Sequence, residues 1–202
     1  MHMHGGGFIA LSSRSTQSYT RKWADELKVP IFSVDYRMPP NHTFPTASND
    51  CLLVYEFLLN HVHKFMNIKP TNIYITGDSA GGNLACSLTG LILRKKLPIP
   101  RGLYIAYPAV DLRLIFSKSR IYSLTDVLLW PSMLLLCLNS YLANDFKLAE
   151  NPIASPILMT EEYVNGVIGD KRFPLQWPKT IVTVGSKDPL LDDTLMLMQK
   201  MV

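Results

Sequence analysis

The sequence predicts an α/β fold in which a mostly parallel β-sheet is flanked by helices. Short runs of β-branched and aromatic residues alternate with longer segments of helical spacing, the order of strands and crossover helices in a parallel sheet. The length of 202 residues and the hydrophobic fraction of 48% are sufficient for one domain with a large core.

The alternation assigns the elements in order. Segments with strand character are short, apolar and rich in Ile, Val or Tyr: 1–3 as a strand end, 29–36, 71–77, 102–108 and 179–185. Segments with helical spacing of apolar or small residues lie between or after them: 17–27, 51–66, 80–96 and around 190–201.

The alternation breaks at residues 113–178, which combine an apolar helical portion with a Pro-rich connector. We therefore expect a single α/β domain over 1–202, with 113–178 as an irregular, cap-like insertion over one end of the sheet. The alternative is that its aromatic, Leu and Met side chains belong to the ordinary core. The apolar run that begins at 127 is too short to span a bilayer and contains Pro131, which favours a buried or interfacial helix.

Composition argues against several classes of partner. The net charge is +4 and the basic residues are scattered, so we expect no nucleic-acid binding. The three cysteines give neither a disulfide framework nor a zinc spacing, which favours buried thiols in a reducing compartment. Because the chain opens with MHMHGGG, we expect no signal peptide. A cytoplasmic protein is the expectation, with lipid-droplet surfaces as an additional location.

Residues 77–81, Gly77-Asp78-Ser79-Ala80-Gly81, fit the pattern G-x-S-x-G between a predicted strand and a predicted helix. In that context the serine is a nucleophile held on a sharp, strained turn, and the two glycines provide the space that the turn requires. The N–H groups at the start of the helix point toward a developing oxyanion. The alternative is a serine that merely caps the helix.

A second glycine-rich motif, His4-Gly5-Gly6-Gly7, follows the predicted strand end at 1–3. A glycine run at that place lets backbone N–H groups face a substrate carbonyl, which would supply the other half of an oxyanion hole. His2 and His4 lie two residues apart on a strand, but no third metal ligand is evident, so we expect no metal and no cofactor.

Asp188 directly follows the strand predicted over 179–185, where a parallel sheet presents chemically active side chains. It would orient and support a histidine. The alternative is that Asp188, Asp192 or Asp193 caps the last helix, which we prefer for the latter two.

With these motifs in place, the chain resembles the hormone-sensitive lipase family of α/β-hydrolases. The matching segments are HGGGF (4–8), VDYRMPPNHTFPTASND (34–50), GDSAGGNLA (77–85), AYPAVDL (106–112), NPIASPIL (151–158) and GSKDPLLDD (185–193). Segments 12–27 and 119–129 look closer to the animal lipases than to the bacterial esterases. The resemblance implies Ser79 as nucleophile, Asp188 as triad acid and an oxyanion hole from the N–H groups of Gly5, Gly6 and Ala80.

The histidine of the triad is expected after the acid in this fold. All five histidines precede Asp188. A helix, a strand and two connections, together roughly 25 residues, normally separate acid and histidine. The expectation is therefore a fragment of a longer hydrolase that lacks the first strands and the histidine and is nearly inactive as written.

Three functions remain open at this point. The first is hydrolysis of hydrophobic carboxylic esters, such as acylglycerols, through an acyl-enzyme, with acyl chains or a lipid-droplet or membrane surface meeting the apolar residues Trp130, Met133, Leu134, Leu135 and Leu136. The second is a non-catalytic, receptor-like protein that binds a small ligand in the same pocket. The third is amide hydrolysis, since amides and esters share the mechanism.

Overall fold

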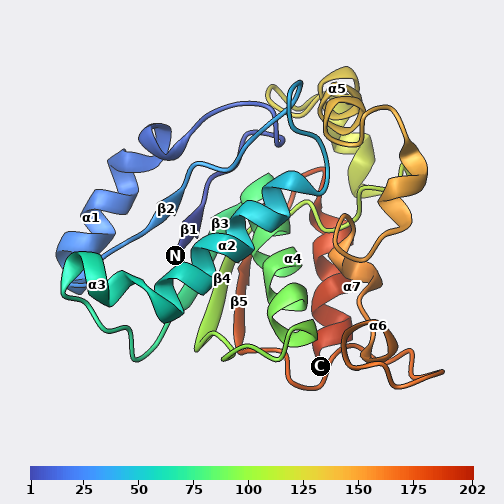
Figure 1. The fold of residues 1–202 in the computed structure, drawn as a ribbon. Helices are drawn as coiled ribbons and strands as arrows, with labels where there is room; N and C mark the ends of the chain where they lie inside the picture. Colours follow the sequence, from blue (N-terminus) through green and yellow to red (C-terminus); the bar gives the residue numbers. More distant parts are fainter.

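The computed structural model describes all 202 residues and contains a five-stranded, fully parallel sheet (Figure 1). The strands lie in the order β2-β1-β3-β4-β5. Their bounds are β1 His2–Met3, β2 Ser33–Val34, β3 Tyr74–Asp78, β4 Gly102–Ala106 and β5 Thr180–Thr183. The predicted fold class is confirmed. The strand predicted over 29–36 is much shorter, because only Ser33 and Val34 pair with the two-residue strand β1.

Seven α-helices connect and cover the strands: α1 Gln17–Leu27, α2 Thr46–Asn60, α3 Val62–Met66, α4 Ala80–Arg94, α5 Pro131–Tyr141, α6 Glu161–Asn165 and α7 Leu191–Met201. The helix predicted over 17–27 is confirmed. The one predicted over 51–66 begins earlier and is divided at His61, whose φ of −131° is outside the helical range.

Helix α4 lies between the sheet and α2 and forms the centre of the core (Figure 1). Alternate strand residues face it, and Ile75, Leu103 and Ile105 are buried there. Thirteen of the fifteen residues of α4 are buried, and its small residues allow close packing on both sides. This helix begins immediately after Ser79, so the core fixes the position of the serine turn.

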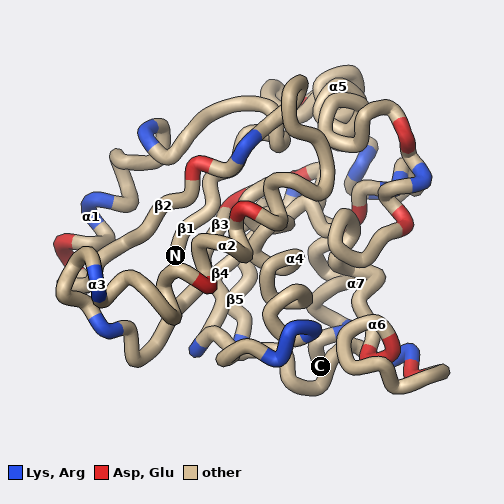
Figure 2. The backbone as a smooth tube through the Cα atoms, viewed as in Figure 1, with Lys and Arg blue, Asp and Glu red and all other residues tan.

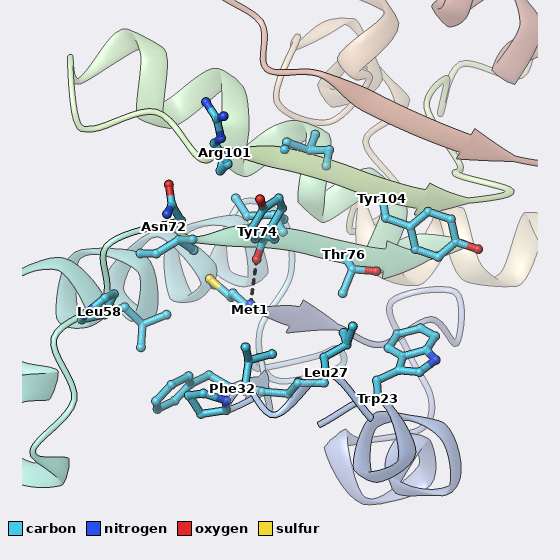
Figure 3. Close-up of a pocket in the computed structure, with 18 of the residues that line it drawn as sticks. Met1, Trp23, Leu27, Phe32, Leu58, Asn72, Tyr74, Thr76, Arg101 and Tyr104 are labelled. Carbon is cyan, nitrogen blue, oxygen red and sulfur yellow. Dashed lines mark hydrogen bonds between the residues drawn. The ribbon is translucent and has the colours of Figure 1, made fainter. Parts of the chain in front are cut away.

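The opposite face of the sheet meets α1 and is partly open (Figure 3). Trp23 and Leu27 of α1 and the strand residues Tyr74 and Tyr104 line a groove of about 1620 Å³. The N-terminal amine of Met1 donates a hydrogen bond to the Tyr74 carbonyl oxygen at 2.8 Å inside it. None of the predicted site residues lines this groove.

Residues 113–178 contain α5, α6 and three 3₁₀ helices, η2 Ser119–Leu124, η3 Phe146–Glu150 and η4 Pro156–Leu158. This region contributes buried core residues, including Tyr141 and Ile157. The first half exposes large apolar side chains: Leu114, Ile115, Phe116, Leu124, Val127, Leu128, Leu135 and Leu136. None of the helices combines the length and the apolar character that a membrane-spanning helix needs. Lys and Arg are distributed over many elements (Figure 2).

Candidate active site

Ser79 occupies the turn between β3 and α4 with φ 53° and ψ −118°, a backbone conformation that is strained for any residue with a side chain. The turn is held by backbone hydrogen bonds: the Ser79 N–H donates to the Ala106 carbonyl at 2.9 Å, and the Ala109 N–H donates to the Ser79 carbonyl at 3.2 Å. The Ser79 side chain is partly exposed and does not cap α4. The alternative of a helix-capping serine is therefore wrong.

Gly77 and Gly81 make this turn sterically feasible. A Cβ atom at Gly77 would lie 2.5 Å from the Gly81 carbonyl carbon. One at Gly81 would overlap the Met3 carbonyl oxygen and lie 2.6 Å from that of His4. The first turn of α4 therefore packs directly against the end of β1, and no side chain larger than hydrogen fits between them.

The early glycine motif lies beside the serine turn. A Cβ at Gly5 would overlap the carboxylate of Asp78, so the backbone of Gly5 packs directly against that carboxylate. Gly6 and Gly7 have positive φ values of 104° and 61°, and the Gly6 N–H makes no backbone hydrogen bond. The motif thus turns sharply next to the residue that precedes Ser79.

His4 is fully buried and stabilises the glycine loop from within. Its Nδ1 atom lies 2.7 Å from the Gly5 carbonyl oxygen, and its ring stacks on Tyr36 at 4.3 Å between centroids. The Tyr36 hydroxyl donates to the His4 carbonyl at 2.8 Å. The two early histidines do not share a site, because the ring of His2 contacts Ser33 and Tyr19 instead.

Tyr19 of α1 is a site neighbour that the sequence analysis missed. Its hydroxyl donates to Asp78 Oδ1 at 3.3 Å and lies 3.1 Å from His2 Nε2. Burial raises the pKa of Asp78, although the hydrogen bond from Tyr19 opposes that shift. Burial also lowers the pKa of His2 to about 4, so its ring is neutral at pH 7. No local pattern reveals Tyr19, since its contact with Asp78 depends on the packing of α1 against the sheet.

Asp188 lies in the turn between β5 and α7, two strands away from Ser79. Its Oδ1 accepts the Leu190 N–H at 2.8 Å, and the Leu191 N–H donates to its carbonyl at 3.1 Å. Burial raises the pKa of the Asp188 carboxyl, and the nearby Asp126 adds to the shift. Tyr107, which follows the intervening strand β4, has its pKa raised by burial and by both Asp78 and Asp188.

Asp192 and Asp193 do not cap α7, so that prediction is wrong. The N-cap residue is Leu190, which provides no side-chain acceptor. Asp192 instead accepts the backbone N–H of Ser119 at 2.8 Å, and Asp193 pairs with Arg120 at 2.6 Å. Burial raises the pKa of Asp193 more than Arg120 lowers it, as expected when desolvation outweighs the attraction within a buried pair.

None of the five histidines hydrogen-bonds to Ser79 or Asp188 in the chain. His2 and His4 are buried in the networks described above. His42 lies in the loop before α2, and His61 and His63 are exposed around α3.

Comparison with known proteins identifies the fold family. A family model described as the alpha/beta hydrolase fold matches residues 1–202. The chain belongs to the α/β-hydrolase fold family. It is 39% identical to the hormone-sensitive lipase of Mus musculus over 141 residues, 70% of this chain and 18% of the lipase. It is 32% identical to an esterase of Acinetobacter venetianus over 193 residues, 96% of this chain and 57% of the esterase. The predicted resemblance to hormone-sensitive lipases is confirmed.

Solved structures agree with this assignment. Carboxyl esterase 2 of Tuber melanosporum matches with a TM-score of 0.86 at 25% identity, over 98% of this chain and 61% of the esterase. The esterase of Pyrobaculum calidifontis matches with the same TM-score at 27% identity, over 99% of this chain and 61% of that protein. This α/β-hydrolase chain thus spans less than two thirds of each of these relatives.

Proposed function

We propose that the protein is a serine hydrolase that cleaves carboxylic esters of hydrophobic acyl groups. The observation that carries the proposal is the conformation of Ser79: a strained, positive-φ residue at the carboxyl end of β3, with a side chain that does no structural work as a helix cap. Relatives named lipase, esterase and ethyl acetate hydrolase support an ester as the substrate class.

In the proposed reaction, Ser79 Oγ attacks the ester carbonyl carbon while a histidine accepts the hydroxyl proton. The carbonyl π electrons move onto oxygen. Ala80 is the first residue of α4, so its N–H has no partner within the helix, and we propose that it donates to this oxyanion together with the N–H groups of Gly5 and Gly6. Collapse of the tetrahedral intermediate breaks the bond between the carbonyl carbon and the alcohol oxygen. The alcohol leaves with the proton that the histidine had accepted from Ser79. Water then attacks the carbonyl carbon of the acyl-enzyme and gives a proton to the histidine. The histidine returns this proton to Ser79 Oγ as the acid product leaves.

Asp188 is proposed as the acid that orients the histidine and supports its positive charge. It follows β5, two strands away from the strand that precedes Ser79, at the same edge of the parallel sheet. None of the five histidines of the chain hydrogen-bonds to Ser79 or Asp188, so the base of the proposed reaction is not assigned to any of them.

Residues 113–178 are proposed as a cap-like region that meets the acyl chain or a lipid surface. Helix α5 reaches the glycine loop, because a Cβ at Gly7 would overlap the sulfur of Cys137. On the same helix Leu135 and Leu136 are exposed, and Trp130 precedes it with 39% of its surface accessible. Exposed apolar side chains of this kind suit a lipid droplet or a membrane surface.

The test compares Ser79→Ala with wild type in the full-length natural protein, using p-nitrophenyl esters of two to ten acyl carbons. We expect kcat to fall by a factor on the order of 10⁶, as when the nucleophile of a serine hydrolase is removed. A fluorophosphonate probe should label Ser79, as read by peptide mass. Ser18→Ala, an exposed position on α1, is the control and should keep the wild-type rate. Equal rates for Ser79→Ala and wild type would refute the assignment.

A further inference from the structure

The N–H groups at the start of α7 are satisfied from two segments of the chain. The N-cap residue, Leu190, provides no side-chain acceptor, and Asp188 accepts the N–H groups of Leu190 and Leu191. One of these N–H groups, that of Asp192, instead donates to the hydroxyl of Ser119 at 3.1 Å. Ser119 belongs to η2, in the region 113–178, and is only 2% exposed. The helix that follows Asp188 is therefore capped by a side chain from a distant part of the chain.

The interaction between Ser119 and Asp192 is reciprocal. The Ser119 N–H donates to Asp192 Oδ2 at 2.8 Å, while the Asp192 N–H donates to Ser119 Oγ. This pair of bonds is that of a capping box, in which a serine and an acidic residue satisfy each other's backbone N–H groups. In an ordinary capping box the two residues are three apart, whereas here they are 73 apart.

Ser119 also contacts the acid turn itself. Its hydroxyl donates to the carbonyl oxygen of Pro189 at 3.1 Å. Pro189 is the residue after Asp188, and Leu190, the next one, donates its N–H to the Asp188 carboxylate. The hydroxyl of Ser119 thus fixes the short segment that determines where the carboxylate of Asp188 points.

The adjacent Arg120 adds a second tie between the same two segments. Its Nη2 atom donates to Asp193 Oδ2 at 2.6 Å and to the Asp111 carbonyl at 3.2 Å. The side chains of Arg120 and Asp193 are only 11% and 8% exposed. Because the pair is shielded from water, η2 and the first turn of α7 are held together as one unit.

From these contacts we infer that Ser119 is a positioning residue for Asp188, acting through Pro189 and the cap of α7. The inference rests on the proposed function, because it assigns Ser119 a role in aligning the acid of the triad. Ser119 does not touch the reacting atoms. Its loss would displace the carboxylate and weaken its support of the histidine, with little effect on where the substrate binds.

The experiment measures kcat, KM and the pH profile of kcat with p-nitrophenyl butyrate in the full-length natural protein. For Ser119→Ala we expect kcat to fall about 10- to 100-fold, the effect of a small misplacement of a reacting group, with KM within about twofold. The acidic limb of the kcat profile should move to lower pH, because a displaced carboxylate no longer raises the pKa of the histidine.

Ser123→Ala is the matched control. Ser123 is in the same 3₁₀ helix and is 5% exposed, but its hydroxyl bonds only to the Arg120 carbonyl, within η2. This variant should keep kcat within about twofold and leave the pH profile unchanged. Two variants of Asp192 test the other partner of the reciprocal bonds. Asp192→Asn keeps an oxygen acceptor for the Ser119 N–H and should retain kcat. Asp192→Ala removes this acceptor and should lower kcat.

The outcomes separate the inference from the proposed function. If Ser79→Ala abolishes activity but Ser119→Ala keeps kcat and its pH profile, or loses no more than Ser123→Ala does, the inference is overturned and the proposed function stands. If Ser79→Ala is as active as wild type, the proposed function itself fails. If Ser119→Ala does not fold, the comparison of Asp192→Asn with Asp192→Ala decides, and equal rates for those two variants would overturn the inference.

Discussion

The serine turn and the acid turn follow parallel strands of the same sheet, but they are stabilised in different ways. The geometry of Ser79 depends mainly on its immediate neighbours, with Gly77 and Gly81 removing the side chains that would block the turn. The turn of Asp188 depends on a residue of η2 that is far away in the sequence, Ser119. The turn of the nucleophile can therefore be recognised in the sequence as a contiguous motif. The residue that supports the turn of the acid cannot, because it lies far away along the chain.

The two turns also differ in strain. Ser79 has a positive φ and is surrounded by backbone atoms in close contact. Asp188 has ordinary backbone geometry, and the glycine before it, Gly185, has its nearest potential Cβ contact at 3.7 Å. The glycines of the serine turn tolerate no larger side chain, while the acid turn should tolerate small changes in size and depend on its polar contacts instead.

The largest effect is expected for Gly81→Ala, because its new methyl group would overlap the Met3 carbonyl oxygen and force β1 away from α4. We expect the free energy of unfolding to fall by more than about 3 kcal/mol, measured by urea denaturation of the chain. Gly185→Ala, with space for the methyl group, is the control and should change it by less than about 1 kcal/mol. Equal losses at the two glycines would remove the distinction between the turns.

The polar support of the acid turn is tested by Arg120→Met, which leaves Asp193 buried without its partner. The free energy of unfolding should fall by about 3 kcal/mol. Arg172→Met breaks a pair of the same length, 2.6 Å, in which the arginine is 68% exposed, and should cost less than about 1 kcal/mol. The double variant Arg120→Met/Asp193→Leu should recover most of the loss. A loss for Arg120→Met no greater than for Arg172→Met would contradict this account.

The strain at the nucleophile is tested by Ser79→Gly. Glycine adopts a positive φ without steric cost, so the free energy of unfolding should rise by about 1 kcal/mol. Ser79→Ala retains a Cβ atom and should bring no such gain. The measurement is the urea midpoint at constant slope. A stability for Ser79→Gly at or below that of Ser79→Ala would show that the turn is not strained.

The smallest effect concerns the charge of Asp188. Burial raises the folded-state pKa of this carboxyl above its ordinary value of 3.8, so the ionised form is disfavoured in the folded protein. The ionised carboxylate therefore destabilises the folded protein. This effect is absent at a pH below the pKa of Asp188 in the unfolded chain and complete at a pH above its pKa in the folded protein. Asp188→Asn should therefore be slightly more stable than wild type at pH 7 and equally stable near pH 3.

The control is Asp170, whose pKa is shifted in the opposite direction to that of Asp188. The side-chain hydrogen bond from Arg172 lowers the pKa of Asp170 to about 2, so Asp170→Asn should bring no gain in stability at pH 7. Thermal unfolding at the two pH values measures both variants. A loss of stability at pH 7 for Asp188→Asn would show that the carboxylate is stabilised by its surroundings.

The sequence by itself determined the parallel α/β fold, the serine motif and the early glycine motif. These features depend on interactions within a few residues: strand and helix periodicity, and glycines at places where a backbone must approach closely. The same local patterns located Asp188 after its strand. They did not determine the length of the strand predicted over 29–36, because pairing with a two-residue partner limits it.

Only the tertiary structure decided what surrounds these motifs. It placed the Tyr19 hydroxyl on Asp78, packed Gly5 against the same carboxylate, and paired Asp192 with Ser119 rather than with its own helix. Such contacts join segments that are distant along the chain, and the packing of α1 beside the sheet and of η2 against the start of α7 sets them. A serine or tyrosine that makes one of these contacts has the same local sequence pattern as one that does not, so the three-dimensional arrangement alone distinguishes them.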